Sequence, residues 1–164
     1  MTQLTSDWLS VNPNASSAPV FPPAKPVPPK FDGTFPGCTE GGGVFERQGK
    51  WYLMFGACCC FCHQGSNAYV FWADAPLGPY TFLGDVVPWN ATLQQYALRG
   101  QQFGIMPVHS ARGNVLLYTG QRWGSALDGK KCHDWQYWAP LEFDSQGRVQ
   151  PMRWIDKFEL DMPE

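Results

Sequence analysis

The sequence lacks the features that mark membrane-spanning and nucleic-acid-binding proteins. It has no run of about 18 apolar residues, the length that a transmembrane helix requires. Its 12 lysines and arginines are balanced by 14 aspartates and glutamates. The chain therefore has neither the basic surface that binds nucleic acid nor a polybasic patch for lipid headgroups. We expect a neutral partner, with no nucleic acid and no membrane.

A secretory signal is also missing from the N-terminus, where a charged segment followed by an apolar one would stand. Two N-glycosylation sequons, at Asn14 and Asn90, nevertheless favour a secreted protein. The sequence fits either an intracellular protein or a secreted one whose true start lies upstream. Of these two, we expect an extracellular or secretory location.

The composition favours strands and turns over helices. The chain has 17 glycines, 15 prolines and 8 tryptophans, and 15% of its residues are aromatic. Glycine and proline form turns, and aromatic residues are enriched in strands. Proline is concentrated between Pro13 and Pro36, where the missing N–H donors prevent a sheet ladder. An all-β protein is predicted, with a proline-rich, partly disordered loop near its start.

Several strands are predicted after this loop. Residues 44–47 and 51–55 should form a hairpin through Gln48-Gly49-Lys50, with glycine at the position that needs a positive φ. Residues 68–73 are nearly all apolar and should be covered on both faces. Residues 80–83 follow a proline-containing turn and are predicted as a short edge strand.

The hairpin pattern recurs later in the chain at a constant offset of 64 residues. The matching positions are Val44 with Val108, Gly49 with Gly113, Leu53 with Leu117 and Gly56 with Gly120. Trp72-Ala73 also matches Trp138-Ala139 once two residues are gapped. A unit of several strands repeating at about 60 to 70 residues suggests β-propeller blades, somewhat longer than the common repeat families.

The predicted fold is therefore a β-propeller fragment with about two complete four-stranded blades plus parts of their neighbours. Residues 1–37 are predicted to be a partial blade and the proline-rich loop, and residues 38–164 to be the propeller blades. Because a propeller ring closes with roughly four to eight blades, the missing N-terminal blades of the same parent protein are expected partners.

Five short motifs carry a family likeness. They are Glu40 to Leu53, Ala73 to Tyr80, Gly100 to Gln102, Gly120 to Trp123 and Tyr137 to Asp144. In order and spacing they resemble motifs of glycoside hydrolase family 43, and the last three resemble its galactan 1,3-β-galactosidase-like branch. The resemblance covers about residues 38–162. It implies a five-bladed propeller with a sugar-binding pocket at its axis, and hydrolysis with inversion.

By motif position, the resemblance implies that Glu40 is the general acid and that Gln101 has the base-like role given to a glutamine in that branch. The family's catalytic base aspartate and acid-tuning aspartate have no evident counterpart, and we expect the chain to start after the blades that carry them. Gly42 replaces a proline of the glutamate motif, and Gln121 replaces an aspartate. Glutamine cannot take up a proton as a carboxylate does, so Gln101 by itself can only orient a water molecule or a sugar hydroxyl.

Five further residues are candidates for binding the sugar. They are Arg122, Trp123, His133, Trp135 and Tyr137. A guanidinium beside an indole suits sugar hydroxyls or a carboxylate, and the aromatic rings could stack on sugar. Strand alternation would send Trp135 and Tyr137 to one face and Trp138 to the other. The alternatives are a structural ion pair at Arg122 and a loop pair at His133-Asp134 that caps the next strand.

The cysteines are concentrated in one place. Cys58-Cys59-Cys60-Phe61-Cys62 and the adjoining His63 suggest a zinc or redox site. In an extended strand, however, Cys59 points away from the other three, and the usual second ligand pair is absent. No metal and no cofactor are therefore expected. The thiols are predicted to be buried or to form disulfides, with Cys38 or Cys132 as partners.

The sequence thus predicts a glycoside hydrolase acting on a polysaccharide or oligosaccharide of plant or algal type, with β-galactan as the candidate. We expect this enzyme to be incomplete in this chain. A non-catalytic carbohydrate-binding propeller is the first alternative. A small metal or redox protein based on the cysteine run is the second.

Overall fold

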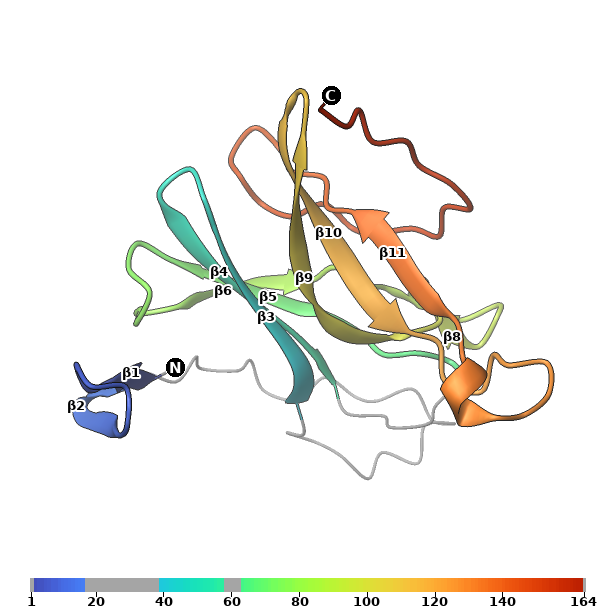
Figure 1. Ribbon diagram of the computed structural model, residues 1–164. Coiled ribbons are helices and arrows are strands. Elements are labelled where there is room, and N and C mark those ends of the chain that lie inside the picture. The colour runs from blue at the N-terminus through green and yellow to red at the C-terminus, as the bar shows by residue number, and fades with distance from the viewer. Residues whose placement is uncertain (1, 17–38, 58–62, 164) are drawn as a thin grey trace.

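The computed structural model describes residues 2–16, 39–57 and 63–163 (Figure 1). These residues form antiparallel strands and one short 3-10 helix, Lys131–His133. This confirms the predicted all-β class. Within the described ranges, no helix is both long and apolar enough to cross a lipid bilayer.

The first large sheet has four strands in the order β3-β4-β5-β6. Their bounds are β3 (Thr39–Arg47), β4 (Lys50–Ala57), β5 (Tyr69–Ala73) and β6 (Thr81–Asp85). Gln48 and Gly49 connect β3 to β4 with φ values of 52° and 76°, the left-handed pair that joins two twisted strands tightly. Val70 and Phe71 of β5 point to opposite faces and are both fully buried. The predicted hairpin, the doubly covered strand and the edge strand are confirmed.

The second large sheet has the order β11-β10-β9. Its strands are β9 (Gln101–Ser110), β10 (Gly113–Gln121) and β11 (Gln136–Pro140). It repeats the hairpin-plus-strand plan of the first sheet, but in the described residues it has three strands where the sequence predicts a complete four-stranded blade. The offset of 64 residues does not hold at the turn, because Gly49 lies within the first turn whereas Gly113 is already paired with Ser110 beyond the second. The second hairpin therefore has a different strand register from the first, although the match of Gly49 with Gly113 predicts the same one.

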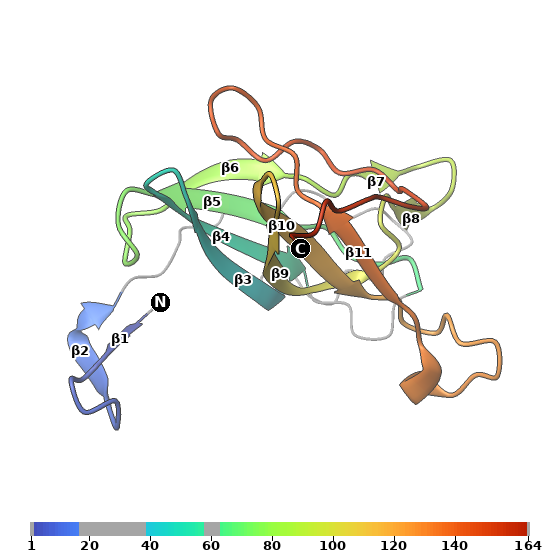
Figure 2. The same cartoon turned by 45° about the horizontal axis from the view of Figure 1, so that its top comes forward.

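The two sheets lie side by side, with β3 next to β9 (Figure 1, Figure 2). Their facing surfaces form one hydrophobic core that includes Phe45 and Tyr52 from the first sheet and Tyr118 and Ala139 from the second. A Cβ on Gly43 would lie 2.8 Å from Cγ1 of Ile105. Glycine is therefore needed where β3 approaches β9. The sheets are arranged as two neighbouring blades of a propeller, which agrees with the predicted fold class.

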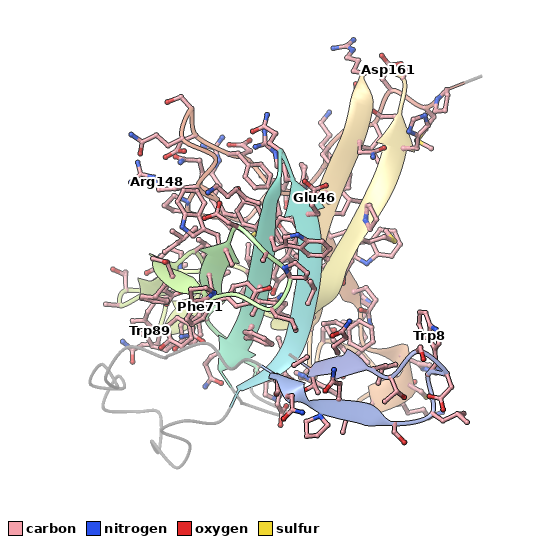
Figure 3. All side chains as sticks on the ribbon, turned by 90° about the vertical axis from the view of Figure 1, so that its left-hand side faces the viewer. Trp8, Glu46, Phe71, Trp89, Arg148 and Asp161 are labelled. Atoms are coloured by element: carbon pink, nitrogen blue, oxygen red, sulfur yellow. The ribbon has the colours of Figure 1, made fainter. Side chains whose placement is uncertain are left out.

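Two small hairpins complete the structure. β7 (Trp89–Asn90) pairs with β8 (Gln95–Tyr96), and β1 (Thr2–Leu4) pairs with β2 (Val11–Ser16). The β1–β2 hairpin stands apart from the large sheets (Figure 2). In Figure 3, Trp8 on this hairpin lies low in the view, whereas Asp161 lies at its top. The proline-rich stretch falls mostly within residues 17–38, outside the described residues, so the boundary at 37/38 stays a prediction.

Two buried tyrosines provide a matched test of core hydrogen bonding. The Tyr52 hydroxyl donates to the Gly147 carbonyl at 2.7 Å, whereas the buried Tyr118 hydroxyl has no hydrogen-bond partner within the described structure. Tyr52→Phe should lower the free energy of unfolding by about 1 kcal/mol, and Tyr118→Phe should leave it unchanged or raise it by up to about 1 kcal/mol. Urea unfolding measures both. A loss at Tyr118 as large as that at Tyr52 would contradict the difference between them.

Candidate functional site

Glu40 lies near the start of β3, at an irregularity in the strand. Glu40 pairs with Gly56 of β4, and the regular register resumes only at Gly43. Gly41, which follows Glu40, has a φ of 63°, and a Cβ there would lie 1.7 Å from the backbone oxygen of Gln102. No residue other than glycine fits that approach. The bulge therefore fixes the backbone that carries Glu40 directly against the start of β9.

Gln101, the first residue of β9, contacts Glu40 directly. Its Nε2 donates a hydrogen bond to Oε2 of Glu40 at 2.8 Å, although the residues are 61 positions apart. Gln101 is 6% exposed, and Glu40 is half-buried. The structure thus brings together the two residues that the sequence singled out for chemistry.

Trp123 fixes the orientation of the Gln101 amide. Its indole Nε1 donates to Oε1 of Gln101 at 2.7 Å. Since an indole N–H can only donate, the amide oxygen must face Trp123 and the amide NH₂ must face Glu40. Oε2 of Glu40 is therefore an acceptor, and a proton carried by Glu40 would reside on Oε1. The three side chains form a directional hydrogen-bonded series across the ends of two neighbouring blades.

The loop after β10 holds Trp123 in place. Both oxygens of Asp134 accept backbone hydrogen bonds, from Gly124 at 2.9 Å and from Ala126 at 3.0 Å. The hydrogen bonds from the Gly124 N–H and then from the Ala126 N–H lower the pKa of the Asp134 carboxyl group below its ordinary value. Nζ of Lys131 lies 2.9 Å from the centroid of the Trp123 ring. One ring face is thus covered by an ammonium group, and Trp123 acts here through its N–H. Nothing in the sequence marks Lys131, because this contact depends on how the loop folds.

The other predicted binding residues occupy different surroundings. His133 is exposed, and its Nδ1 lies 2.9 Å from a carboxylate oxygen of Asp128 in the same loop. Tyr137 is 6% exposed and stacks on Trp154 with ring centroids 4.3 Å apart, so its ring packs in the core. In the described structure neither residue makes a hydrogen bond to Glu40 or Gln101.

Arg122 and Trp135 lie next to each other. The backbone N–H of Arg122 donates to the carbonyl of Trp135 at 3.0 Å, and its guanidinium lies 5.3 Å from the Trp135 ring. Trp135 precedes β11, so strand alternation does not determine its direction, contrary to the expectation that it shares a face with Tyr137. Trp135 and Trp138 are both exposed, whereas Tyr137 is buried.

The cysteine run, Cys58 to Cys62, lies outside the described residues. Cys132 is exposed and is a free thiol in the described structure, so the predicted disulfide to Cys132 is not formed there. In the ranges that the structure covers, no group of three or more His, Cys, Asp or Glu side chains could hold a metal ion.

Replacing Trp123 by phenylalanine tests its role in orienting Gln101. The variant keeps an aromatic ring but removes the indole N–H, so the Gln101 amide loses one of its two fixed partners. Solvent exchange of the Gln101 side-chain amide protons, followed by NMR, should accelerate about five- to tenfold. Trp51→Phe, in β4, is the matched control and should leave it unchanged. Unaltered exchange in Trp123→Phe would show that the amide is held by other contacts.

Neither a protein-family model nor a curated protein matches this sequence. The fold is similar to solved enzyme structures. A β-1,3-galactosidase of family GH43 is 17% identical, with a TM-score of 0.66 over 97% of this chain and 28% of its own. An exo-β-1,3-galactanase from Phanerochaete chrysosporium, solved with β-1,3-galactotriose, is 19% identical, with a TM-score of 0.59 over 92% of this chain and 28% of its own. An exo-β-1,3-galactanase from Clostridium thermocellum is 24% identical, with a TM-score of 0.56 over 68% of this chain and 23% of its own.

At these sequence identities, the similarity establishes the fold alone. The chain spans about a quarter of the length of these enzymes. The protein therefore has, over this length, the β-propeller fold of glycoside hydrolase family 43.

Proposed function

We propose that this chain carries the acid-bearing part of an inverting glycoside hydrolase that acts on β-1,3-linked galactans. The observation that supports it is the series Trp123, Gln101 and Glu40, in which an otherwise flexible amide is fixed against a half-buried carboxyl group. The substrate class is suggested by the similar structures, one solved with galactodeoxynojirimycin and others with galactose or β-1,3-galactotriose.

In this proposal Glu40 is the general acid. Its Oε1 proton passes to the glycosidic oxygen as the bond to the anomeric carbon breaks, while a water molecule attacks that carbon from the opposite face. Oε2 keeps its hydrogen bond from Gln101 throughout, which holds the carboxyl plane in one orientation.

Gln101 has a positioning role in this scheme. Its oxygen already accepts a hydrogen bond from Trp123, and its second lone pair can accept one from a water molecule or a sugar hydroxyl. An amide does not take up the water proton as a carboxylate would. We assign that step to a group outside the described residues, and propose that further blades of the same protein supply it.

A non-catalytic sugar-binding protein is the second candidate. One observation favours it: the residue paired with Glu40 is an amide and not a second carboxylate. A site with one carboxyl group and oriented amide and indole groups can bind hydroxyls without cleaving a bond.

One experiment separates the two candidates. β-1,3-Galactotriose is incubated with the chain and with a longer form of the protein that includes the preceding blades, and galactose release is measured together with binding by calorimetry. Release of α-galactose, the inverted anomer, by either form supports the hydrolase. Binding without release by both forms supports the sugar-binding candidate. If neither form binds or cleaves the sugar, both candidates are wrong.

The extracellular or secretory location remains part of the proposal. Asn14 of β2 and Asn90 of β7, the asparagines of the two sequons, are both exposed. Their exposure makes them accessible to glycosylation. Glycan at either site in protein isolated from its source would support secretion.

A further inference from the structure

A pocket of about 340 Å³ lies beside β11, away from the Glu40 site. It is formed between β11 and the chain segment that runs back past it after Pro151 (Figure 1). Its polar and indole lining includes Arg122, Gln136, Trp138, Trp154, Asp156 and Lys157. Neither Glu40, Gln101 nor Trp123 lines it. Its volume is in the range of about 300 to 1,000 Å³ that is typical of small-molecule sites.

The pocket has an excess of positive charge. Arg122 and Lys157 line it, and the guanidinium of Arg99 lies 3.9 Å from the centroid of Trp154. The guanidinium of Arg122 lies 5.0 Å from the same ring. Asp156 is the acidic residue among those that line the pocket, and its Oδ1 already accepts a hydrogen bond from Nε1 of Trp154. Two guanidinium groups thus lie over one indole, and the lining adds Lys157 and one carboxylate, that of Asp156.

Arg122 has unused hydrogen-bonding capacity. Its Nε is buried and has no hydrogen-bond partner in the described structure. Burial, and then the neighbouring Arg99, lower the pKa of Arg122, which shows that the charge is held in an unfavourable environment. A buried N–H without an acceptor costs free energy. An anion bound at the part of Arg122 that lines the pocket would offset the repulsion between the two guanidinium groups.

The rest of the pocket suits a sugar ring. Trp138 is exposed, so its indole is available to cover the apolar face of a pyranose. Gln136 is exposed at the start of β11 and offers both an amide donor and an acceptor for hydroxyl groups. Carboxylate recognition and sugar recognition are therefore combined in one place.

We propose that this pocket binds an acidic monosaccharide, a hexuronate, with the guanidinium of Arg122 binding its carboxylate. Lys157 contributes to the attraction from the rim, and the indole of Trp138 contacts the ring. This assignment does not depend on hydrolysis at Glu40, because the two sites share no lining residue.

Calorimetric titration with D-galacturonate, D-glucuronate and D-galactose tests the assignment. A uronate should bind at least about tenfold more tightly than galactose, as expected for a charge-assisted pair of hydrogen bonds. Arg122→Gln should abolish this preference. Arg112→Gln is the matched control, because Arg112 pairs with Asp161 at an exposed site elsewhere, and it should leave the preference unchanged. Equal affinity for galactose and the uronates, or an unchanged preference in Arg122→Gln, would overturn the assignment.

Two further measurements keep the test decisive if Arg122→Gln does not fold. Lys157→Gln alters an exposed residue and should weaken uronate binding about two- to fivefold. In the wild-type protein, galacturonate should shift the indole N–H resonances of Trp138 and Trp154 but not that of Trp51. Shifts confined to other tryptophans would contradict the site. Displacement of galacturonate by an equal concentration of acetate would show that the ring contributes nothing, and would overturn the sugar part of the proposal.

Discussion

Release of galactose from β-1,3-galactotriose by the longer form of the protein is expected to fall about 100- to 10,000-fold when Glu40 is replaced by glutamine. The substitution preserves the size of the side chain, and the new amide oxygen can still accept the hydrogen bond from Gln101 that Oε2 accepts now. The variant lacks only the acidic proton. The rate of hydrolysis should therefore change far more than the affinity for the trisaccharide, which calorimetry measures separately.

The leaving group distinguishes a general acid from a residue that merely shapes the site. In an aryl β-galactoside made from an acidic phenol, the phenolate leaves without being protonated. Glu40→Gln should therefore slow hydrolysis of this substrate much less than that of the trisaccharide. Glu46→Gln is the matched control on the same strand. Glu46 accepts a hydrogen bond from the Gly49 N–H in the turn and lies about 20 Å along β3 from Glu40. Equal losses with both substrates, or no loss at all, would contradict the assignment of Glu40.

Replacing Gly41 by alanine should destabilise the protein by about 2 to 4 kcal/mol. Gly41 has a φ of 63°, and a Cβ there would lie 1.7 Å from the carbonyl oxygen of Gln102. That neighbour is backbone of β9, so relief requires β3 and β9 to separate. Unfolding in urea measures the loss in free energy.

Gly49→Ala separates the steric contribution from the conformational one. Gly49 also has a positive φ, of 76°, but nothing lies within 4 Å of its ideal Cβ position. Its loss should be about 1 to 2 kcal/mol, the cost of a left-handed conformation alone. The excess at Gly41 then measures how tightly the two blades meet beside Glu40. Equal losses at both glycines would show that β3 and β9 yield easily there.

The local features were predictable because they depend on neighbouring residues. Gln48-Gly49 between two apolar runs specifies a tight hairpin through the backbone conformations it permits, and the apolar run of β5 specifies burial on both faces. The repeat was recognisable for the same reason, since each blade begins with such a hairpin. The register of the second hairpin was not predictable in this way. Gly49 lies inside the first turn, whereas the matching Gly113 lies just beyond the second.

Some contacts of the candidate site were likewise predictable from the sequence, and others were not. Family resemblance placed Glu40 and Gln101 together, and the structure joins them with a hydrogen bond. It did not indicate that Trp123 would orient Gln101 through its N–H, or that Tyr137 would be buried. These outcomes depend on the loop between β10 and β11, where Asp134 fixes the backbone through hydrogen bonds to Gly124 and Ala126.

By itself, the sequence determined the all-β class and the repeated hairpins, because composition and turn chemistry act over short stretches of chain. Only the tertiary structure decided which groups meet. The Glu40, Gln101 and Trp123 series and the pocket around Arg122 each join segments far apart in the chain. Such contacts depend on the relative positions of whole sheets and loops, which no local pattern encodes.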